Sequence, residues 1–188
     1  SLLNELKGHF KILVTYRTAS QGGNVQLTNE EYLHLIETIS SIDRFQMIDI
    51  EWESNIDVEM HKRIIENALR HQKEIIVSYH NFSETPPLEE IKFTYYKMQK
   101  LKPDYVKIAV MPKEKQDVAT LLEAVAYTSE AISQHVIGIS MSHLGVVSRT
   151  AQGVFGGTVS YGCLGEPQAP VQIHVKKLKK QLIIYESM

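Results

Sequence analysis

The chain has 188 residues, of which 43% are hydrophobic and 22% are charged, and its formal net charge is −2 at pH 7. This composition fits one substantial globular core and excludes a disordered or collagen-like chain. The near-neutral charge gives no electrostatic reason to expect nucleic acid or an anionic membrane as a partner, and no apolar run approaches the about 18 residues of a spanning helix. Cys163 is the single cysteine, so no internal disulfide or cysteine–metal cluster is expected, and a reducing cytoplasm is the predicted location.

Strand-like apolar runs alternate with helical patterns along the chain. Successive runs begin about 30 residues apart, which is the size of a βαβ unit. Such alternation predicts a parallel sheet covered by helices. No Pro/Gly/Ser-rich linker interrupts it, so residues 1–188 are predicted to form a single domain. The strand-like runs are residues 11–17, 46–52, 74–80, 105–110, 136–141 and, less clearly, 155–161.

Two helix starts are marked by capping sequences. Thr28 is followed three residues later by Glu31, which predicts a capping box. Thr85 and Pro86 have the residue types of an N-cap and a first helical position, which predicts that a helix begins there. A final amphipathic helix is predicted over residues 174–187. Its expected apolar side consists of Val175, Leu178, Leu182 and Ile183.

Lys107 is the one charged residue in the strand-forming run of residues 105–111. An edge strand would explain it, because edges use charge to block unwanted pairing. The alternative is a lysine held inside an apolar barrel, where desolvation lowers its pKa and makes the amine a nucleophile. The segment by itself favours the edge, and the pattern of the other strands favours the interior.

Four of the predicted strands have one polar face, because alternate residues of a strand point to opposite sides. In each strand the charged or titratable residue lies at or near the C-terminal part. Parallel barrels and open parallel sheets carry their chemistry at that end. The residues that share these faces are Thr15 with Arg17, Asp49 with Glu51, Ser78 with His80, and Lys107 with Tyr105 and Ala109.

Taken together, these segments resemble the type I 3-dehydroquinate dehydratases. The resemblance follows nearly the whole chain in the right order, and it implies a TIM (β/α)8 barrel with about six of its eight strands present. The domain would then lack its first two βα units. The matching segments are Thr15-Tyr16-Arg17-Thr18 with Gly22-Gly23, Ile48-Asp49-Ile50-Glu51, Ser78-Tyr79-His80-Asn81-Phe82 with Thr85-Pro86, Val106-Lys107-Ile108-Ala109-Val110, Ile139-Ser140-Met141-Ser142, Gly145 to Ser148-Arg149, Gly153-Val154-Phe155-Gly156, and Ala169-Pro170 with Gln172.

The resemblance implies a reaction that uses neither a metal nor an organic cofactor. Lys107 would form a Schiff base with the C3 ketone of 3-dehydroquinate. His80 would remove the C2 proton and then protonate the departing C1 hydroxyl, giving 3-dehydroshikimate. The residues that match substrate-binding positions of the family are Arg17, Arg149, Gln172 and Gln168.

A second group of residues is expected to support this chemistry. Asp49 and Glu51 could form a structural ion pair with Arg17 or Lys107, or they could tune the pKa of the lysine. Both possibilities remain open at the level of sequence. The resemblance also places Met141 at the site, as part of a matching segment.

Three positions depart from the family pattern. Gln21 stands where an acidic residue usually orients the histidine; an amide can still bind His80, but it raises the basicity less. Gln168 replaces a serine, and Val171 replaces a glycine, which is costly if that backbone needs a positive φ. We therefore expect weaker substrate binding by this loop.

Two alternatives compete with the assigned reaction. One is another Schiff-base barrel enzyme, such as an aldolase. The other is a catalytically inactive fragment that serves in binding or assembly. The predicted partners are the small molecule 3-dehydroquinate and, by family resemblance, a second copy of the chain in a homodimer.

Overall fold

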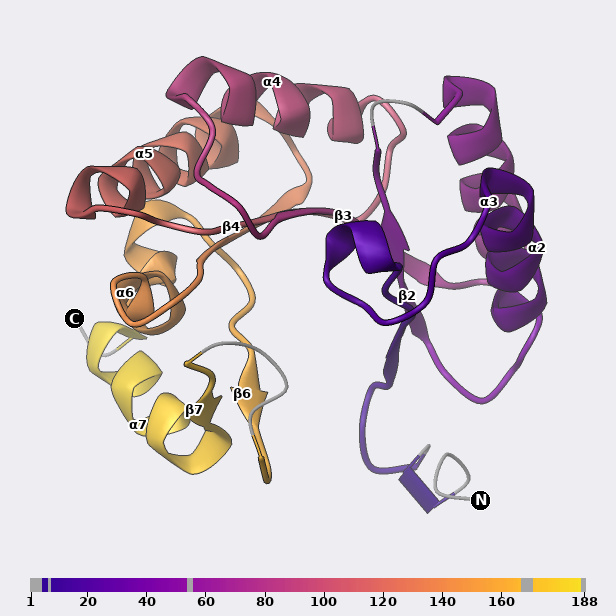
Figure 1. The fold of residues 1–188 in the computed structure, drawn as a ribbon. Helices are drawn as coiled ribbons and strands as arrows, with labels where there is room; N and C mark the ends of the chain where they lie inside the picture. The colour runs from indigo at the N-terminus through magenta and orange to yellow at the C-terminus, as the bar shows by residue number, and fades with distance from the viewer. Residues whose placement is uncertain (1–4, 7, 54–55, 167–170, 187–188) are drawn as a thin grey trace.

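The computed structural model describes residues 5–6, 8–53, 56–166 and 171–186. Its main element is a sheet of five strands that lie side by side in chain order (Figure 1). Every neighbouring pair is parallel, as the sequence predicts. The strands are β1 (Leu13–Thr15), β2 (Met47–Glu51), β3 (Glu74–Asn81), β4 (Tyr105–Val110) and β5 (His135–Ser140).

A long helix follows each of the first four strands and returns the chain to the start of the next strand. The segment after β5 is instead built from short pieces before a last helix, α7. In chain order the helices are η1 (Ala19–Gln21), α2 (Asn29–Ser40), α3 (Val58–Arg70), α4 (Leu88–Gln99), α5 (Lys115–Ala131), α6 (Val146–Thr150), η2 (Gln152–Phe155) and α7 (Val175–Glu186).

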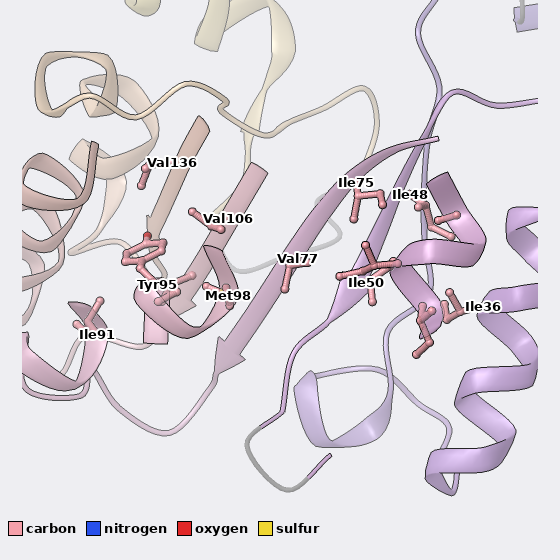
Figure 2. Packing of buried hydrophobic residues seen from close by; sticks show 14 of the residues in the cluster. Ile36, Ile48, Ile50, Ile75, Val77, Ile91, Tyr95, Met98, Val106 and Val136 are labelled. Carbon is pink, nitrogen blue, oxygen red and sulfur yellow. The ribbon is translucent and has the colours of Figure 1, made fainter. Parts of the chain in front are cut away.

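The two faces of the sheet have different surroundings, as the alternation of side chains predicts. One face packs against the helices and forms the main core, which contains Ile36, Ile48, Ile50, Ile75, Val77, Tyr95, Met98 and Val106 (Figure 2). The opposite face carries a smaller apolar cluster of Ile76, Ala109, Ile137, Ile139 and Met141. Lys107 belongs to this inner face of β4, and β4 lies between β3 and β5. The edge-strand explanation of Lys107 is therefore wrong.

The helix starts agree with the sequence in one case and differ in the other. Thr28 caps α2, and its reciprocal hydrogen bonds with Glu31 confirm the predicted capping box. The predicted start at Thr85 and Pro86 is wrong, because α4 begins at Leu88 with Pro87 in the N-cap position. The Thr85 hydroxyl donates to a carbonyl of the loop after β4 instead of capping the helix.

The sixth strand lies later than the sequence indicates. The described residues 155–161 contain no strand, and Gly157 makes only an isolated bridge to β5. Gly156 ends η2 with a φ of 80° and turns the chain, so extended pairing starts only beyond it. β6 (Gly162–Cys163) then pairs in parallel with β7 (Ile173–His174) in a separate two-stranded sheet.

The last helix forms where the sequence predicts it, but it buries less than its pattern suggests. Leu178 is almost fully buried, whereas Val175 and Ile183 are 38% and 48% exposed. Across the described ranges, no helix combines the length and apolar character needed to cross a membrane.

Candidate active site

Lys107 points from β4 to the inner side of the sheet, where only 6% of the residue is exposed. Its Nζ lies 3.3 Å from Asp49 Oδ2 and 4.4 Å from the centre of the Tyr161 ring. Burial lowers the pKa of Lys107, Asp49 partly opposes this effect, and the charges of Arg17 and Arg149 add to the lowering. A lowered pKa increases the fraction of neutral amine, which is the nucleophilic form.

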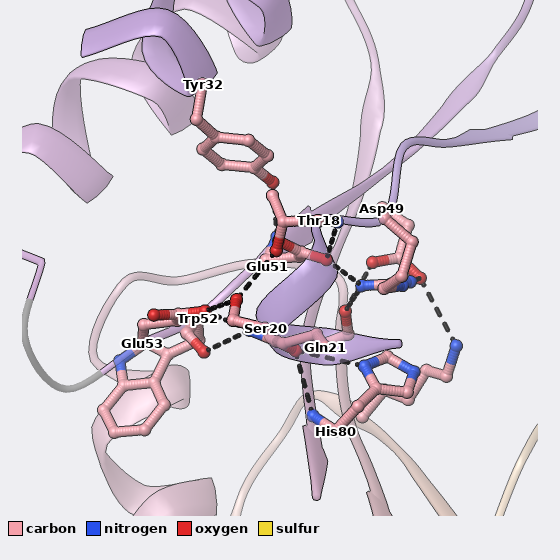
Figure 3. A network of polar contacts seen from close by, with 12 residues as sticks. Thr18, Ser20, Gln21, Tyr32, Asp49, Glu51, Trp52, Glu53 and His80 are labelled. Atoms are coloured by element: carbon pink, nitrogen blue, oxygen red, sulfur yellow. Dashed lines mark hydrogen bonds and ion pairs between the residues drawn. The ribbon is translucent and has the colours of Figure 1, made fainter. Parts of the chain in front are cut away.

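Asp49 and Glu51 lie on the same face of β2, and both bind Arg17 (Figure 3). Arg17 Nη2 lies 2.9 Å from Asp49 Oδ2, and Nη1 lies 3.2 Å from Glu51 Oε1. Ser78 accepts a hydrogen bond from Arg17 at 2.9 Å and donates one to Asp49 Oδ1 at 2.5 Å. The structural ion pair and the contact with Lys107 therefore occur together, on the same carboxylate.

The two carboxyl groups respond differently to this environment. Burial alone would raise the pKa of Asp49, but Lys107 and Arg17 outweigh it and hold that pKa well below its usual range. Burial raises the pKa of Glu51 in spite of hydrogen bonds from Thr18 and the ion pair with Arg17. Asp49 is thus a fixed negative charge beside Lys107 at neutral pH.

His80, near the end of β3, is oriented by the side chain of Gln21 (Figure 3). Gln21 Oε1 accepts from the His80 backbone N–H at 2.9 Å, and its Nε2 donates to the Trp52 carbonyl at 3.0 Å. These two partners fix the orientation of the amide, because a backbone N–H can only donate and a carbonyl can only accept. The His80 Nδ1 that lies 3.2 Å from Oε1 must then carry the proton, and Nε2 carries the lone pair.

The same surroundings keep the imidazole of His80 neutral. Burial lowers its pKa well below the ordinary value, and the positive charges of Lys107 and Arg17 lower it further. Phe82 stacks beside the ring, with centroids 6.4 Å apart and planes at 17°. His80 therefore has the protonation state of a base at neutral pH, with a lowered basicity.

A cavity of about 110 Å³ forms where these side chains meet. Its walls combine an amine, an imidazole and a guanidinium group with apolar surfaces, which suits a small anionic or polar molecule. The lining residues are His80, Phe82, Lys107, Ala109, Ile139, Met141, Arg149, Tyr161 and Gln172. His80 and Phe82 also border a wider hollow of about 520 Å³ that includes Gln21, so they form the shared wall of both spaces.

The structure brings five of the ten predicted site residues to this cavity: His80, Lys107, Met141, Arg149 and Gln172. Arg149 lies in the wall with 2% of its surface exposed, and burial lowers its pKa. Met141 and Gln172 also line it, and Gln172 Nε2 donates to the Gly162 carbonyl at 3.3 Å. Arg17 does not border the cavity, because its guanidinium is directed to the β2 carboxylates. Gln168 lies outside the described residues.

Two members of the site are missing from the sequence prediction. The alternation of side chains puts Ser78 on the face of His80 but indicates no role for it, although Ser78 holds both Asp49 and Arg17. Tyr161 belongs to the irregular segment after β5, and no periodic signal places it beside Lys107. Over the described part of the chain, His, Cys, Asp and Glu form no group of three or more that could bind a metal ion.

A parallel β/α sheet with a buried lysine, a neutral histidine and a buried arginine around one cavity defines a barrel-type enzyme that acts on a small molecule. The profile of the family described as Type I 3-dehydroquinase matches residues 1–188. The chain is 60% identical over 185 residues to 3-dehydroquinate dehydratase of Staphylococcus haemolyticus, covering 98% of this chain and 77% of that protein.

Two solved structures agree with this match. A type I 3-dehydroquinate dehydratase from Clostridium difficile has a TM-score of 0.90 and 32% identity, covering 100% of this chain and 75% of that one. The 3-dehydroquinate dehydratase from Geobacillus kaustophilus has a TM-score of 0.91 and 28% identity, with coverages of 99% and 71%.

The chain therefore belongs to the type I 3-dehydroquinase family. Members of this family are 3-dehydroquinate dehydratases, which are hydro-lyases, so the predicted family, fold class and enzyme class are confirmed. The alternative of another Schiff-base aldolase family is wrong.

Proposed function

We propose that this chain eliminates water from 3-dehydroquinate through an imine on Lys107 and releases 3-dehydroshikimate. The observation that carries the proposal is that the amine of Lys107 and the neutral imidazole of His80 border one cavity. β3 and β4 are adjacent, and Ala109 is the register partner of His80. Neighbouring strands lie about 4.8 Å apart, so the two groups can reach neighbouring carbons of one ring.

In the first step, the neutral amine of Lys107 adds to the C3 carbonyl of the substrate. Loss of water from the adduct leaves a protonated imine, whose positive charge lies beside the Asp49 carboxylate. This cation withdraws electrons from C2 and makes its C–H bond more acidic. The structure of the Clostridium difficile relative is described with covalent modified comenic acid, which supports covalent chemistry for this site.

In the second step, His80 accepts the C2 proton on Nε2, because Nδ1 already donates to Gln21. The C–H electrons move into the imine and form an enamine. The enamine then expels the C1 hydroxyl as water, using the proton that His80 returns. Hydrolysis of the remaining imine frees the product and regenerates the amine of Lys107, so one water is lost overall.

Arg149 is proposed as the partner of the substrate carboxylate. Its guanidinium borders the cavity in a largely desolvated wall, where a charge-assisted, bidentate hydrogen bond is strongest. Gln172 supplies an amide to a substrate hydroxyl on the same wall. The predicted substrate contacts of Arg17 and Gln168 stay predictions.

Borohydride trapping tests the proposal directly. The protein is reduced in the presence of 3-dehydroquinate, and the adduct is located by peptide mass spectrometry. We expect a stable adduct on Lys107 that disappears in Lys107→Ala. Lys107→Ala and the unmodified chain are also assayed for formation of the conjugated product by its ultraviolet absorbance, so that trapping and turnover are compared on the same samples.

Lys73 provides the matched control, because it is also a buried lysine, at 5% exposure, but donates to the carbonyls of Ile42 and Phe45 away from the cavity. Lys73→Met should keep the adduct on Lys107. Absence of any adduct on the folded chain would support the inactive-fragment alternative and overturn the proposal.

We also propose that the protein is a cytoplasmic homodimer. The single cysteine supports a reducing compartment, and the family resemblance supports the dimer. Sedimentation equilibrium across a range of protein concentrations tests the oligomeric state, and a mass equal to one chain at all concentrations would contradict it.

A further inference from the structure

Tyr161 places the face of its ring beside the nitrogen of Lys107, at 4.4 Å from the ring centre. The ring packs against the inner apolar cluster and borders the same cavity as the lysine. We propose that Tyr161 is a positioning residue that holds the Lys107 nitrogen at the cavity wall and stabilises the positive charge this nitrogen carries, first as ammonium and then as imine. Only the imine part of this inference rests on the proposed function.

Lys107 needs a second anchor, because its contact with Asp49 is long and shared. A lysine ammonium is a point charge on a flexible four-carbon chain, and its distance to Asp49 Oδ2 is 3.3 Å. The same oxygen lies closer to Arg17, at 2.9 Å, and Ser78 holds the other carboxylate oxygen. The Tyr161 ring restricts the nitrogen from another side, which fixes its position relative to the cavity.

The charges around the Lys107 nitrogen leave a clear role for the ring. The titratable groups that face it come from five segments: Asp49 from β2, His80 from β3, Arg17 after β1, Arg149 from α6 and Tyr161 before β6. His80 is neutral and both arginines repel a cation, while the Asp49 carboxylate is shared between Lys107 and Arg17. The negative face of an aromatic ring is then the additional group that favours a cation in this desolvated position.

The hydroxyl of Tyr161 does not take part in this contact. Within the described residues it is shielded from solvent and has no hydrogen-bond partner. Burial raises the pKa of Tyr161, so the ring that faces Lys107 is neutral. Tyr161→Phe therefore removes only the hydroxyl and keeps the aromatic face, whereas Tyr161→Leu removes the face.

The same contact persists during the proposed reaction, because the nitrogen of the imine is the original nitrogen of Lys107. The amine that adds to the ketone is neutral. A positive charge returns to this nitrogen when water leaves and the C=N bond forms, and it is neutralised only when the C2 electrons form the enamine. Loss of the ring should therefore reduce kcat by tenfold or more while KM changes about twofold at most.

Competitive acetylation with acetic anhydride measures the protonation of Lys107 without turnover. Labelling of Lys107 is followed from pH 6 to 11 by peptide mass spectrometry, with exposed Lys113 as the internal reference. In Tyr161→Leu we expect the labelling midpoint of Lys107 to fall by about one pH unit, and in Tyr161→Phe we expect it to stay unchanged. Tyr96→Leu is the matched control, because the Tyr96 ring lies 4.8 Å from Lys100 on the surface, and it should leave Lys107 unaffected.

Circular dichroism and thermal unfolding verify that each variant is folded. If Tyr161→Leu does not fold, 4-cyanophenylalanine at position 161 keeps the ring shape but weakens its negative face, and it should lower the midpoint in the same direction. An unchanged or raised midpoint in a folded variant without the aromatic face overturns the inference. So does a Tyr161→Phe midpoint that falls as far as that of Tyr161→Leu. If the labelling midpoint of Lys107 falls as expected in Tyr161→Leu but no imine can be trapped on the unmodified chain, the proposed function alone is overturned.

Discussion

At the scale of single residues, the tautomer of the His80 imidazole is fixed by an uncharged neighbour, Gln21. The Gln21 amide is held by the Trp52 carbonyl on one side and by the His80 backbone N–H on the other. This arrangement selects one tautomer of the imidazole and leaves Nε2 free to accept a proton. It does so without a negative charge, so nothing at Nδ1 offsets the lowering of the His80 pKa by burial.

A carboxylate at this position should therefore change the pH dependence of the reaction. In Gln21→Glu the added negative charge stabilises the imidazolium form and raises the pKa of His80. The acidic limb of the kcat/KM profile then moves to higher pH, by about one unit for a charge at this distance. Gln21→Leu is the matched variant without a hydrogen-bonding group, and it should lower kcat/KM without that shift. An acidic limb that stays in place in Gln21→Glu would contradict this account of His80.

At the scale of elements, the caps of two helices show which local signals act on their own. The side chain of Thr28 accepts from the backbone N–H of Glu31, and the side chain of Glu31 accepts from the backbone N–H of Thr28. The cap is thus complete within four residues and needs no tertiary contact. Thr85 has an equally suitable residue type, but its hydroxyl is used by the Met111 carbonyl, and the chain enters α4 two residues later.

We expect the capping box at Thr28 to contribute measurably to stability. Thr28→Ala should lower the free energy of unfolding by about 1 kcal/mol, which is the usual cost of an N-cap. Thr28→Asp, which keeps a capping oxygen, should restore most of it. Urea denaturation measures both changes. Equal stability of Thr28→Ala and the unmodified chain would show that the capping box contributes nothing.

The loop that carries Gln172 to the cavity contains a strained residue. Val171 has a φ of 54°, which lies in the left-handed region, and it is 43% exposed, so little burial compensates a β-branched side chain there. The condition under which the sequence predicts that valine is costly at this position, a positive φ, is therefore met.

Replacing Val171 by glycine tests the weaker substrate binding that is expected of this loop. Val171→Gly removes a strain of about 1–2 kcal/mol from the residue that precedes Gln172, so we expect a lower KM with kcat nearly unchanged. Alanine is not β-branched but still disfavours this φ, so the KM of Val171→Ala should lie between those of the unmodified chain and Val171→Gly. A KM for Val171→Gly equal to that of the unmodified chain would refute the link between this backbone strain and substrate binding.

At the scale of the whole molecule, two histidines with lowered pKa values make stability depend on pH. Burial lowers the pKa of both His61 and His80 in the folded state. Each therefore contributes stability above its unfolded pKa of about 6.5, and this contribution is lost as pH falls, because the unfolded chain binds more protons. Glu51, with a raised pKa, acts in the opposite direction, because the folded chain then binds more protons than the unfolded chain.

We expect the free energy of unfolding to fall by about 1–2 kcal/mol between pH 7 and pH 5.5. Urea denaturation at several pH values measures the change. The double variant His61→Asn/His80→Asn should show a flatter dependence over this range. Stability that stays constant or rises as the unmodified chain is acidified would contradict the assigned directions of both pKa shifts.

The parts that the sequence could predict are those in which a short-range pattern is sufficient. Two-residue alternation placed Lys107, His80 and Asp49 on one face, and the family motifs identified the reaction class. The sequence names Arg17 and Lys107 as possible partners of the two β2 carboxylates, but it cannot decide between them, because the paired side chains lie 32, 34 and 58 residues apart. The position of Tyr161 beside Lys107 could not be predicted either, because the chain after β5 is irregular and tertiary packing decides where its side chains lie.

The neutral side chain of Gln21 has a consequence for how a charged substrate arrives. With an amide in place of the acidic residue of the family pattern, the wider hollow beside the cavity carries one negative charge fewer, while Lys107 and Arg149 remain in the cavity wall. An anionic molecule that diffuses toward this end of the sheet then meets a more attractive field, and the rate of encounter becomes more sensitive to ionic strength. We therefore expect this chain to capture an anionic substrate faster than its Gln21→Glu variant, with a weaker base at His80.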